Sequence, residues 1–216
     1  LPPDMKTALV VGLGNRSVTP DSLGPRTAER VLVTRHMGDC LPRDVPMSSV
    51  CAAAPGVLGV TGMETAEILR GMVAHVKPDA VIAVDALAAR SSKRIASTIQ
   101  ITDTGITPGS GVGNHRKALD RRTLGVPVIA VGVPLVVYAS TIASDALCAL
   151  GEGEVEEERI AACVERVVSE KLGEMIVTPR DVDALVERMA GVLADGINQA
   201  LHPSLSSSEI AQLMAQ

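Results

Sequence analysis

The feature that most constrains this chain is a set of short, fully apolar segments separated by segments with helical periodicity. Residues 7–13 (TALVVGL), 80–84 and 127–134 are continuous runs rich in Val, Ile and Ala, and the first ends close to glycine. Such runs are typical of strands buried on both faces of a parallel sheet. Strands that alternate with helices predict an α/β fold, a three-layer sandwich in which helices cover both faces of a mostly parallel central sheet.

Helices are expected after the first strand and before the second buried one. Pro25 is tolerated only in the first turn of a helix, so a helix should begin near Ser22 as N-cap and continue through residues 26–36. Residues 63–76 carry apolar side chains at helical spacing, which predicts an amphipathic helix. Residues 96–102 (ASTIQIT) alternate between polar and apolar, as a half-exposed strand does.

The C-terminal part of the chain has a different character. We expect a single α/β domain over residues 1–216, with an acidic linker and a helical part from about residue 151. Thr178 as cap and Pro179 at the first helical position predict a helix that ends at His202.

Composition excludes several classes of function. The net charge of −5 argues against general binding to nucleic-acid backbones, and a chain with one Tyr and no Phe or Trp has no base-stacking platform. No apolar run reaches the roughly 18 to 20 residues that span a bilayer, and the first residues lack a secretory signal, so we expect no membrane partner and a cytoplasmic location. The four cysteines form no CxxC pair and are expected to be thiols.

A nucleotide site is the first interpretation that the glycines of residues 12–17 (GLGNRS) suggest. Ser17 stands where the third glycine of a dinucleotide motif belongs, and residues 111–117 (GVGNHRK) lack the ending of a phosphate-binding P-loop. Asp21 at the start of the expected helix would repel a phosphate. The motif therefore gives little support for nucleotide binding.

Two aspartates are the stronger candidates for chemistry. In an open α/β sheet, ligands collect at the carboxyl ends of the strands, where Asp21 and Asp85 are expected. Two neighbouring carboxylates repel each other and separate their pKa values, which provides one base toward water and one protonated acid. Asp21 as a helix cap, Asp85 paired with Arg90 and Asp103 in a turn are the structural alternatives, and Asp21, Asp85 and His115 could instead bind a metal.

The glycine-rich segment of residues 103–114 (DTGITPGSGVGN) is expected to be a functional loop beside these acids. No GxSxG serine motif is present, which leaves acid chemistry as the best-supported enzymatic interpretation. Basic side chains at Arg16, Arg90, Lys93 and Arg94 could pair with an acidic group of a substrate. The residues expected to bind substrate are Asn15, Arg16, Arg90, Asp103, Gly109, Gly111, Gly113, Asn114 and His115.

Three long segments resemble the spore germination proteases, also called GPR endopeptidases. They contain TPDSLGP, DALAARSSKRIASTIQITDTGITPGSGVGNHRKALDRR and MIVTPRDVDALVERM, and the resemblance extends over about residues 7–202. It implies an atypical aspartic endopeptidase in which Asp21 and Asp85 are catalytic, with no cofactor. It further implies a fold similar to that of hydrogenase-maturation proteases, whose corresponding positions bind a metal.

The same resemblance implies a biological setting. Members degrade small acid-soluble spore proteins in the spore core during germination, cut next to a glutamate, and are homotetramers made as zymogens with an N-terminal propeptide. Members are longer on the N-terminal side, so we expect the propeptide and an upstream region to be absent from this chain. Leu135 and Tyr138 stand where the family has Thr and Asp, and Arg16 replaces an aromatic residue. A metal-dependent maturation-type protease and an inactive truncated scaffold remain alternatives.

Overall fold

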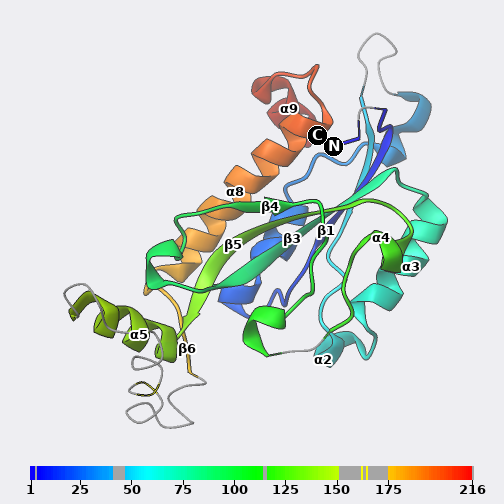
Figure 1. Cartoon of the computed structure of the whole chain (residues 1–216). Helices are drawn as coiled ribbons and strands as arrows, with labels where there is room; N and C mark the ends of the chain where they lie inside the picture. The colour runs from blue at the N-terminus through cyan, green and yellow to red at the C-terminus, as the bar shows by residue number, and fades with distance from the viewer. Residues whose placement is uncertain are drawn as a thin grey trace.

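The computed structural model describes residues 1–2, 4–40, 47–113, 116–150, 162, 164 and 175–215 of the chain. Its centre is a sheet with the strand order β2-β1-β3-β5-β4, to which β6 adds by pairing with β5 (Figure 1). The pairs β1–β2, β1–β3 and β3–β5 are parallel, whereas β4 and β6 run antiparallel to β5. The prediction of a mostly parallel sheet is confirmed. The strands are β1 (Thr7–Gly12), β2 (Ser49–Ala53), β3 (Ala80–Ala89), β4 (Gln100–Thr102), β5 (Val128–Tyr138) and β6 (Ile176–Val177).

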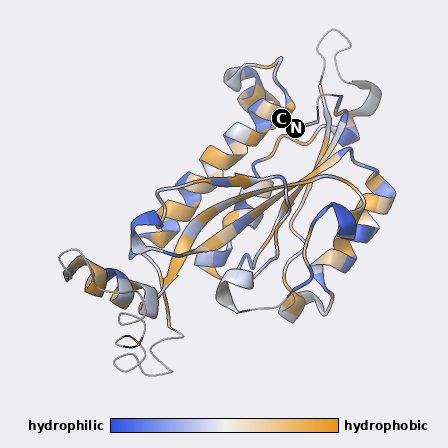
Figure 2. Cartoon of the chain, in the orientation of Figure 1, coloured by the Kyte–Doolittle hydropathy of each residue, from blue (hydrophilic) through white to orange (hydrophobic). Residues whose placement is uncertain are grey.

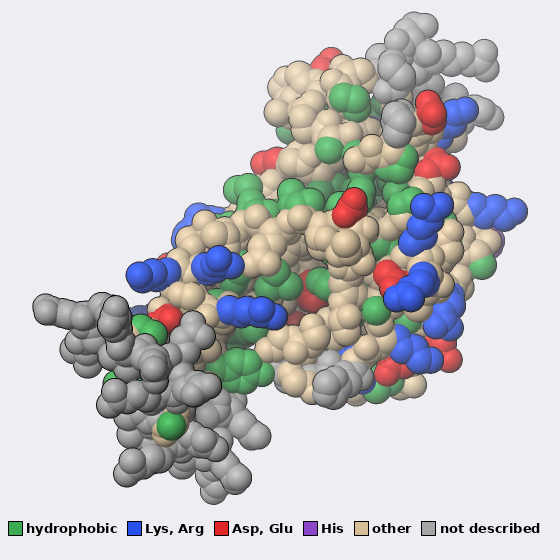
Figure 3. Space-filling view, in the orientation of Figure 1, with side chains coloured by type: hydrophobic (Ala, Val, Ile, Leu, Met, Phe, Trp, Pro, Cys, Tyr) green, Lys and Arg blue, Asp and Glu red, His purple; other side chains and the backbone are tan. Residues whose placement is uncertain are grey.

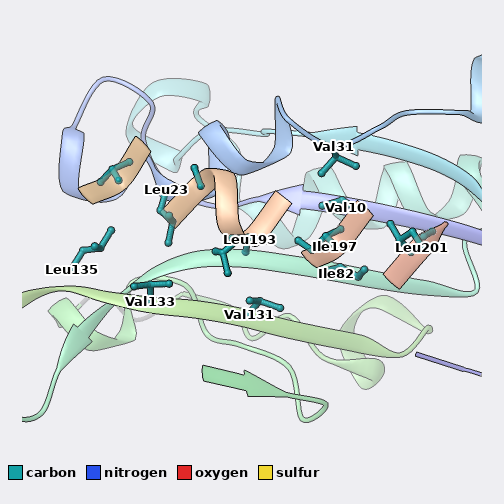
Figure 4. Packing of buried hydrophobic residues seen from close by; sticks show 14 of the residues in the cluster. Val10, Leu23, Val31, Ile82, Val131, Val133, Leu135, Leu193, Ile197 and Leu201 are labelled. Atoms are coloured by element: carbon teal, nitrogen blue, oxygen red, sulfur yellow. The ribbon is translucent and has the colours of Figure 1, made fainter. Parts of the chain in front are cut away.

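Helices cover both faces of this sheet. Alternate strand residues such as Val10, Ile82 and Val131 pack with α1 (Leu23–Ala28) and α8 (Val182–Leu201) on one face (Figure 4). The intervening residues pack with α3 (Thr65–Val76) and α4 (Arg121–Leu124) on the other. The central strands are largely apolar because both of their faces are buried, whereas the helices mix polar and apolar residues (Figure 2). The predicted three-layer arrangement is therefore confirmed.

The remaining elements are short or peripheral. No described helix is both long enough and apolar enough to cross a membrane. The acidic linker that was expected from about residue 151 lies almost entirely outside the described residues. These elements are α2 (Leu58–Thr61), α5 (Ala139–Leu150), α9 (Ser207–Met214) and the 3-10 turns η1 (Thr19–Asp21), η2 (Arg35–Cys40), η3 (Ser92–Arg94) and η4 (Ser110–Val112).

The helix predicted to run through residues 26–36 is wrong in its extent, because α1 ends at Ala28. Beyond it, the Leu32 N–H donates to Asn198 Oδ1 over 2.8 Å, and the Thr34 N–H donates to the Val50 carbonyl over 2.9 Å. These bonds tie the segment to α8 and β2. Contacts distant in sequence therefore override local helical propensity here.

The start of the last long helix was also misplaced. The sequence predicted Thr178 as its cap, whereas α8 begins at Val182 with Asp181 in the N-cap position. The two residues before Thr178 form β6 and pair with the end of β5, so the chain is still extended where the helix was expected to begin. Strand pairing delays the helix by about one turn.

Two strands are longer than predicted. β3 continues to Ala89 rather than ending at Val84, and β5 passes through Pro134 to Tyr138. The register between the two strands shifts at Leu87, where β5 contains an extra residue next to Pro134. A bulge accommodates a proline inside a strand because one ladder hydrogen bond is already interrupted there. Because β3 extends to Ala89, Asp85 lies within the strand rather than at its end.

Candidate active site

The turn after β1 brings the chain back against the end of its own strand. A Cβ at Gly12 would lie 2.1 Å from the Gly24 carbonyl oxygen, and a Cβ at Gly14 would lie 2.1 Å from the Asp21 carbonyl oxygen. Gly14 also has a φ of +107°, a conformation that side chains disfavour. The glycines that suggested a nucleotide loop are required for this close approach, which places Asp21 beside the end of β1.

Asp21 is held in this turn by a backbone donor. The Asn15 N–H donates to Asp21 Oδ2 over 2.7 Å. Burial raises the pKa of Asp21 above its ordinary value, and the hydrogen bond from Asn15 opposes that rise. Asn15 thus contacts the predicted acid through its backbone, and its side-chain Oδ1 instead accepts from the Ser17 N–H at 3.0 Å.

Asp85 lies inside β3, one residue past the point where β1 ends. Gly12, the last residue of β1, pairs with Val84, and Asp85 pairs on its other side with Gly132 of β5. Only 5% of Asp85 is exposed to solvent. Burial, and secondarily the negative charge of Asp21, raise the pKa of Asp85 from 3.8 to about 7, while a hydrogen bond from the Ala86 N–H lowers it.

The two predicted acids lie close enough for the charge of Asp21 to raise the pKa of Asp85. Because Asp85 has a pKa of about 7, roughly half of the molecules hold its proton at neutral pH and most do so below it, with the negative charge of Asp21 beside it. Acidic side chains are visible at the floor of a hollow in the molecular surface, with Lys and Arg side chains on both sides (Figure 3). One carboxylate and one carboxylic acid together can activate water and protonate a leaving group.

A network that the sequence did not predict connects α8 to the Asp21 turn. Glu187 of α8 forms ion pairs with Arg26 and Arg30. The Arg26 Nε–H donates to Ser22 Oγ over 3.0 Å, and the Ser22 hydroxyl donates to the Thr19 carbonyl over 2.8 Å. In the sequence Glu187 is one of many helical charges, so no local signal distinguishes it.

The predicted glycine-rich loop does approach β3. Gly109 and Gly113 flank η4, and Gly111 lies so close to Ala88 that a Cβ would be 3.0 Å from the Ala88 Cβ. Asp103 is exposed just after β4. Asn114 and His115 lie outside the described residues, so their predicted roles stay predictions.

The predicted basic residues lie at the surface near the strand ends. Arg16 is exposed and forms an ion pair with Glu29, whereas Arg90 is exposed directly after β3. Within the described residues no ion pair joins Asp85 to Arg90, which removes that structural explanation for Asp85.

The loop that follows Arg90 is fixed from α5. Asp145 accepts hydrogen bonds from the Ser92 N–H at 2.7 Å, the Ser92 hydroxyl at 2.6 Å and the Ser91 hydroxyl at 3.3 Å. These bonds hold the pKa of Asp145 below its ordinary value. They also fix a loop that carries the exposed side chains of Lys93 and Arg94.

Leu135 and Tyr138, two of the three residues noted above as departures from the motifs of the resemblance, lie on β5. Leu135 is fully buried in the core that β5 shares with α8, and Tyr138 is half-buried at the strand end. An apolar side chain at residue 135 therefore contributes to the core of this protein. Among the described residues, no three His, Cys, Asp or Glu side chains gather as a metal site would require, and His115 is not among those residues.

Comparison with known proteins finds similarity to germination proteases. A sequence profile described as germination protease matches residues 3–151 and 146–214. The chain is 49% identical over 222 residues to the germination protease of Clostridium acetobutylicum, covering 94% of this chain and 68% of that protein. It is 46% identical over 224 residues to the germination protease of Caldanaerobacter subterraneus, covering 95% and 69%.

A solved structure is also similar to this chain. The crystal structure of a NiFe hydrogenase maturation protease, HycI from Thermococcus kodakarensis KOD1, aligns with a TM-score of 0.44 and 20% sequence identity. The alignment covers 91% of this chain and 95% of that one.

Proposed function

Because this chain belongs to the germination protease family, and is therefore a peptidase, we propose that it cleaves peptide bonds of spore proteins by an aspartate-assisted attack of water. The observation that carries this mechanism is the buried Asp85, whose pKa of about 7 depends on its burial and on Asp21. Perturbed carboxyl pairs of this kind are typical of acid–base catalytic sites.

In the proposed reaction the two acids have different roles. Asp21, whose anion accepts the Asn15 N–H, removes a proton from a water molecule. The oxygen of that water bonds to the carbonyl carbon of the substrate at the same time. Asp85, in the form protonated below its pKa of about 7, donates its proton to the leaving nitrogen as the C–N bond breaks. The proton on Asp21 then returns to Asp85 through solvent, which restores the starting state.

The proposed substrates are small acid-soluble spore proteins, cut during germination next to a glutamate. The exposed basic side chains of Arg90, Lys93 and Arg94 support this, since they lie just after the strand that carries Asp85. Arg16 is less suited to bind that glutamate because Glu29 already pairs with it. Gly109, Gly111 and Gly113 would line the cleft, as Asn15, Asp103, Asn114 and His115 also would. We further propose a homotetramer, made as a zymogen, in the spore core.

The test is cleavage of a purified small acid-soluble spore protein, followed by mass spectrometry. Asp21→Asn and Asp85→Asn should each lower kcat by at least about a hundredfold, the usual contribution of a general acid or base. Asp79→Asn is the matched control, because Asp79 is exposed and only accepts the Lys6 and Thr7 N–H groups. Circular dichroism should show that each variant is folded.

The same assay separates the alternatives. Cleavage that EDTA abolishes and a divalent metal restores would favour the metal-dependent protease built on Asp21, Asp85 and His115. A folded wild-type protein that cleaves no spore protein would favour the scaffold. Full activity in Asp21→Asn or Asp85→Asn would refute the proposed mechanism.

A further inference from the structure

β3 extends beyond the strand that pairs with it on one side. β1 ends at Gly12, opposite Val84, whereas β3 continues to Ala89 and remains paired with β5 throughout. The segment from Asp85 to Ala89 thus has one paired edge and one edge from which β1 has withdrawn. The buried acid Asp85 lies at the start of that free edge.

The direction of the backbone groups on this edge follows from the ladder. The Val84 carbonyl accepts from the Leu13 N–H over 2.8 Å, so the peptide groups of Val84 face β1. In a parallel strand every second residue faces the same neighbour, so those of Ala86 and Ala88 also face the side where β1 has ended. The intervening residues face β5, as the bond from the Val81 N–H to the Pro127 carbonyl confirms.

The backbone groups of Ala86 and Ala88 on this edge have no neighbouring strand to pair with, because β1 ends opposite Val84. The Ala86 N–H donates instead to Asp85 Oδ1 over 2.9 Å. Within the described residues the Ala86 carbonyl and the Ala88 N–H have no hydrogen-bond partner on this side. Unpaired strand edges are templates on which another extended chain can pair.

The turns η1 and η4 contact β3 beside this edge, and the backbone that they flank is not fully buried. Residues Ala86, Leu87 and Ala88 are only half-buried. At the far end η4 lies next to Ala88: a Cβ at Gly111 would be 3.0 Å from the Ala88 Cβ and 3.4 Å from the Ala88 nitrogen, so the missing side chain of Gly111 keeps space beside this N–H. A methyl group at residue 111 would narrow the space beside Ala88.

We propose that the substrate binds as an extended strand along the free edge of β3, accepting a hydrogen bond from the Ala88 N–H and donating one to the Ala86 carbonyl. This inference rests on the proposed function and specifies how its substrate is held. A peptide in this place continues the sheet where β1 stops and lies next to Asp85. Strand addition recognises backbone rather than sequence.

The charges near this edge specify the kind of peptide. Arg90 follows the last residue of β3, and Lys93 and Arg94 lie on the next turn; all three are exposed. None forms an ion pair within the described residues, although the charge of Lys93 helps to lower the pKa of Asp145. An extended peptide with an acidic side chain close to the scissile bond matches this arrangement. The backbone pairing and the basic turn thus act on the same peptide.

The experiment measures binding separately from cleavage. A fluorescein-labelled dodecapeptide with a central glutamate, taken from a small acid-soluble spore protein, is titrated with the Asp21→Asn variant. Each backbone N–H in turn is replaced by an ester oxygen, which deletes one donor with little change in shape. The replacement at the residue that faces Ala86 should weaken binding about tenfold, the worth of one hydrogen bond, while its two neighbours should have no effect.

A change in the protein tests the same edge. In the otherwise wild-type protein, Gly111→Ala should raise the KM for cleavage at nearly constant kcat. The control Ser110→Ala, which changes an exposed side chain on the same turn, should leave the KM unchanged. If Gly111→Ala is poorly folded, the ester series decides alone.

The outcomes distinguish the two proposals. Cleavage of the all-amide peptide with a flat ester profile would overturn strand addition and leave the proposed function standing. Position-dependent binding without wild-type cleavage would support strand addition and overturn the proposed function. Neither binding nor cleavage would overturn both.

Discussion

Replacing Asp85 with asparagine is expected to stabilise the folded protein above neutral pH while it abolishes catalysis. The folded pKa of Asp85 is about 7, against an ordinary value of 3.8. Between these two pH values the folded protein keeps a proton that the unfolded chain has released. The folded state therefore binds more protons, and its stability falls as the pH rises.

The size of the effect follows from the pKa shift. A rise from 3.8 to about 7 is roughly 3 pH units, and each unit corresponds to about 1.4 kcal/mol, so the ionised Asp85 destabilises the fold by on the order of 4 kcal/mol at pH 8. Asparagine cannot ionise, and its oxygen still accepts the Ala86 N–H. The stability gained by Asp85→Asn should therefore be smallest near pH 4 and reach its full size above pH 7.

Urea unfolding, monitored by circular dichroism at pH values from 4 to 8, measures this difference. The informative quantity is the change of the free energy of unfolding with pH in the variant relative to the wild type. Asp79→Asn is a control of opposite sign, because backbone hydrogen bonds lower the pKa of the exposed Asp79. An Asp85→Asn variant with the wild-type dependence on pH would refute the argument that burial of this carboxyl destabilises the fold.

Three further results are expected. The rate of peptide cleavage should fall as the pH rises through about 7, because Asp85 then loses the proton it donates; a stopped assay from pH 5 to 9 that shows a rising rate would contradict this role. Gly132→Ala places a Cβ 2.6 Å from the Leu87 side chain, so Leu87 must move and Asp85 should become more hydrated, which shifts that pH profile toward lower pH. Glu187→Gln should lower kcat more than it changes KM and should cost less than about 1 kcal/mol in urea unfolding, because its ion pairs with Arg26 and Arg30 are partly exposed.

The sequence predicted the elements whose cause is local. The apolar run of residues 7–13 contains β1, and the periodic apolar positions of residues 63–76 contain α3. The ends of helices were less predictable where they depend on distant partners. Asn198 of α8 captures the Leu32 N–H, and no pattern near residue 32 indicates this.

The candidate site was predictable in part for the same reason. The rule that ligands collect at strand ends selected Asp21 and Asp85 as neighbours, and the charge of Asp21 contributes to the raised pKa of Asp85; their catalytic role stays a prediction. The rule suggested, however, that a polar residue such as Asp85 ends its strand. Pairing with β5 keeps the chain extended to Ala89, and this creates the free edge beside the acid.

A helix from the far end of the chain supports the turn that carries Asp21. The turn that carries Asp21 has no buried residue in η1, and above pH 7, where Asp85 is ionised, the repulsion between the two carboxylates acts to separate it from β3. Glu187 opposes this movement, because it binds Arg26, which in turn hydrogen-bonds Ser22 next to Asp21. The core contacts of α8 with Leu23 and the strands also hold this turn against the sheet. Asp85 itself belongs to the alternate residues of β3 that face α3 and α4, as Val81 and Ala83 do, so α8 acts on the pair of acids through the position of Asp21.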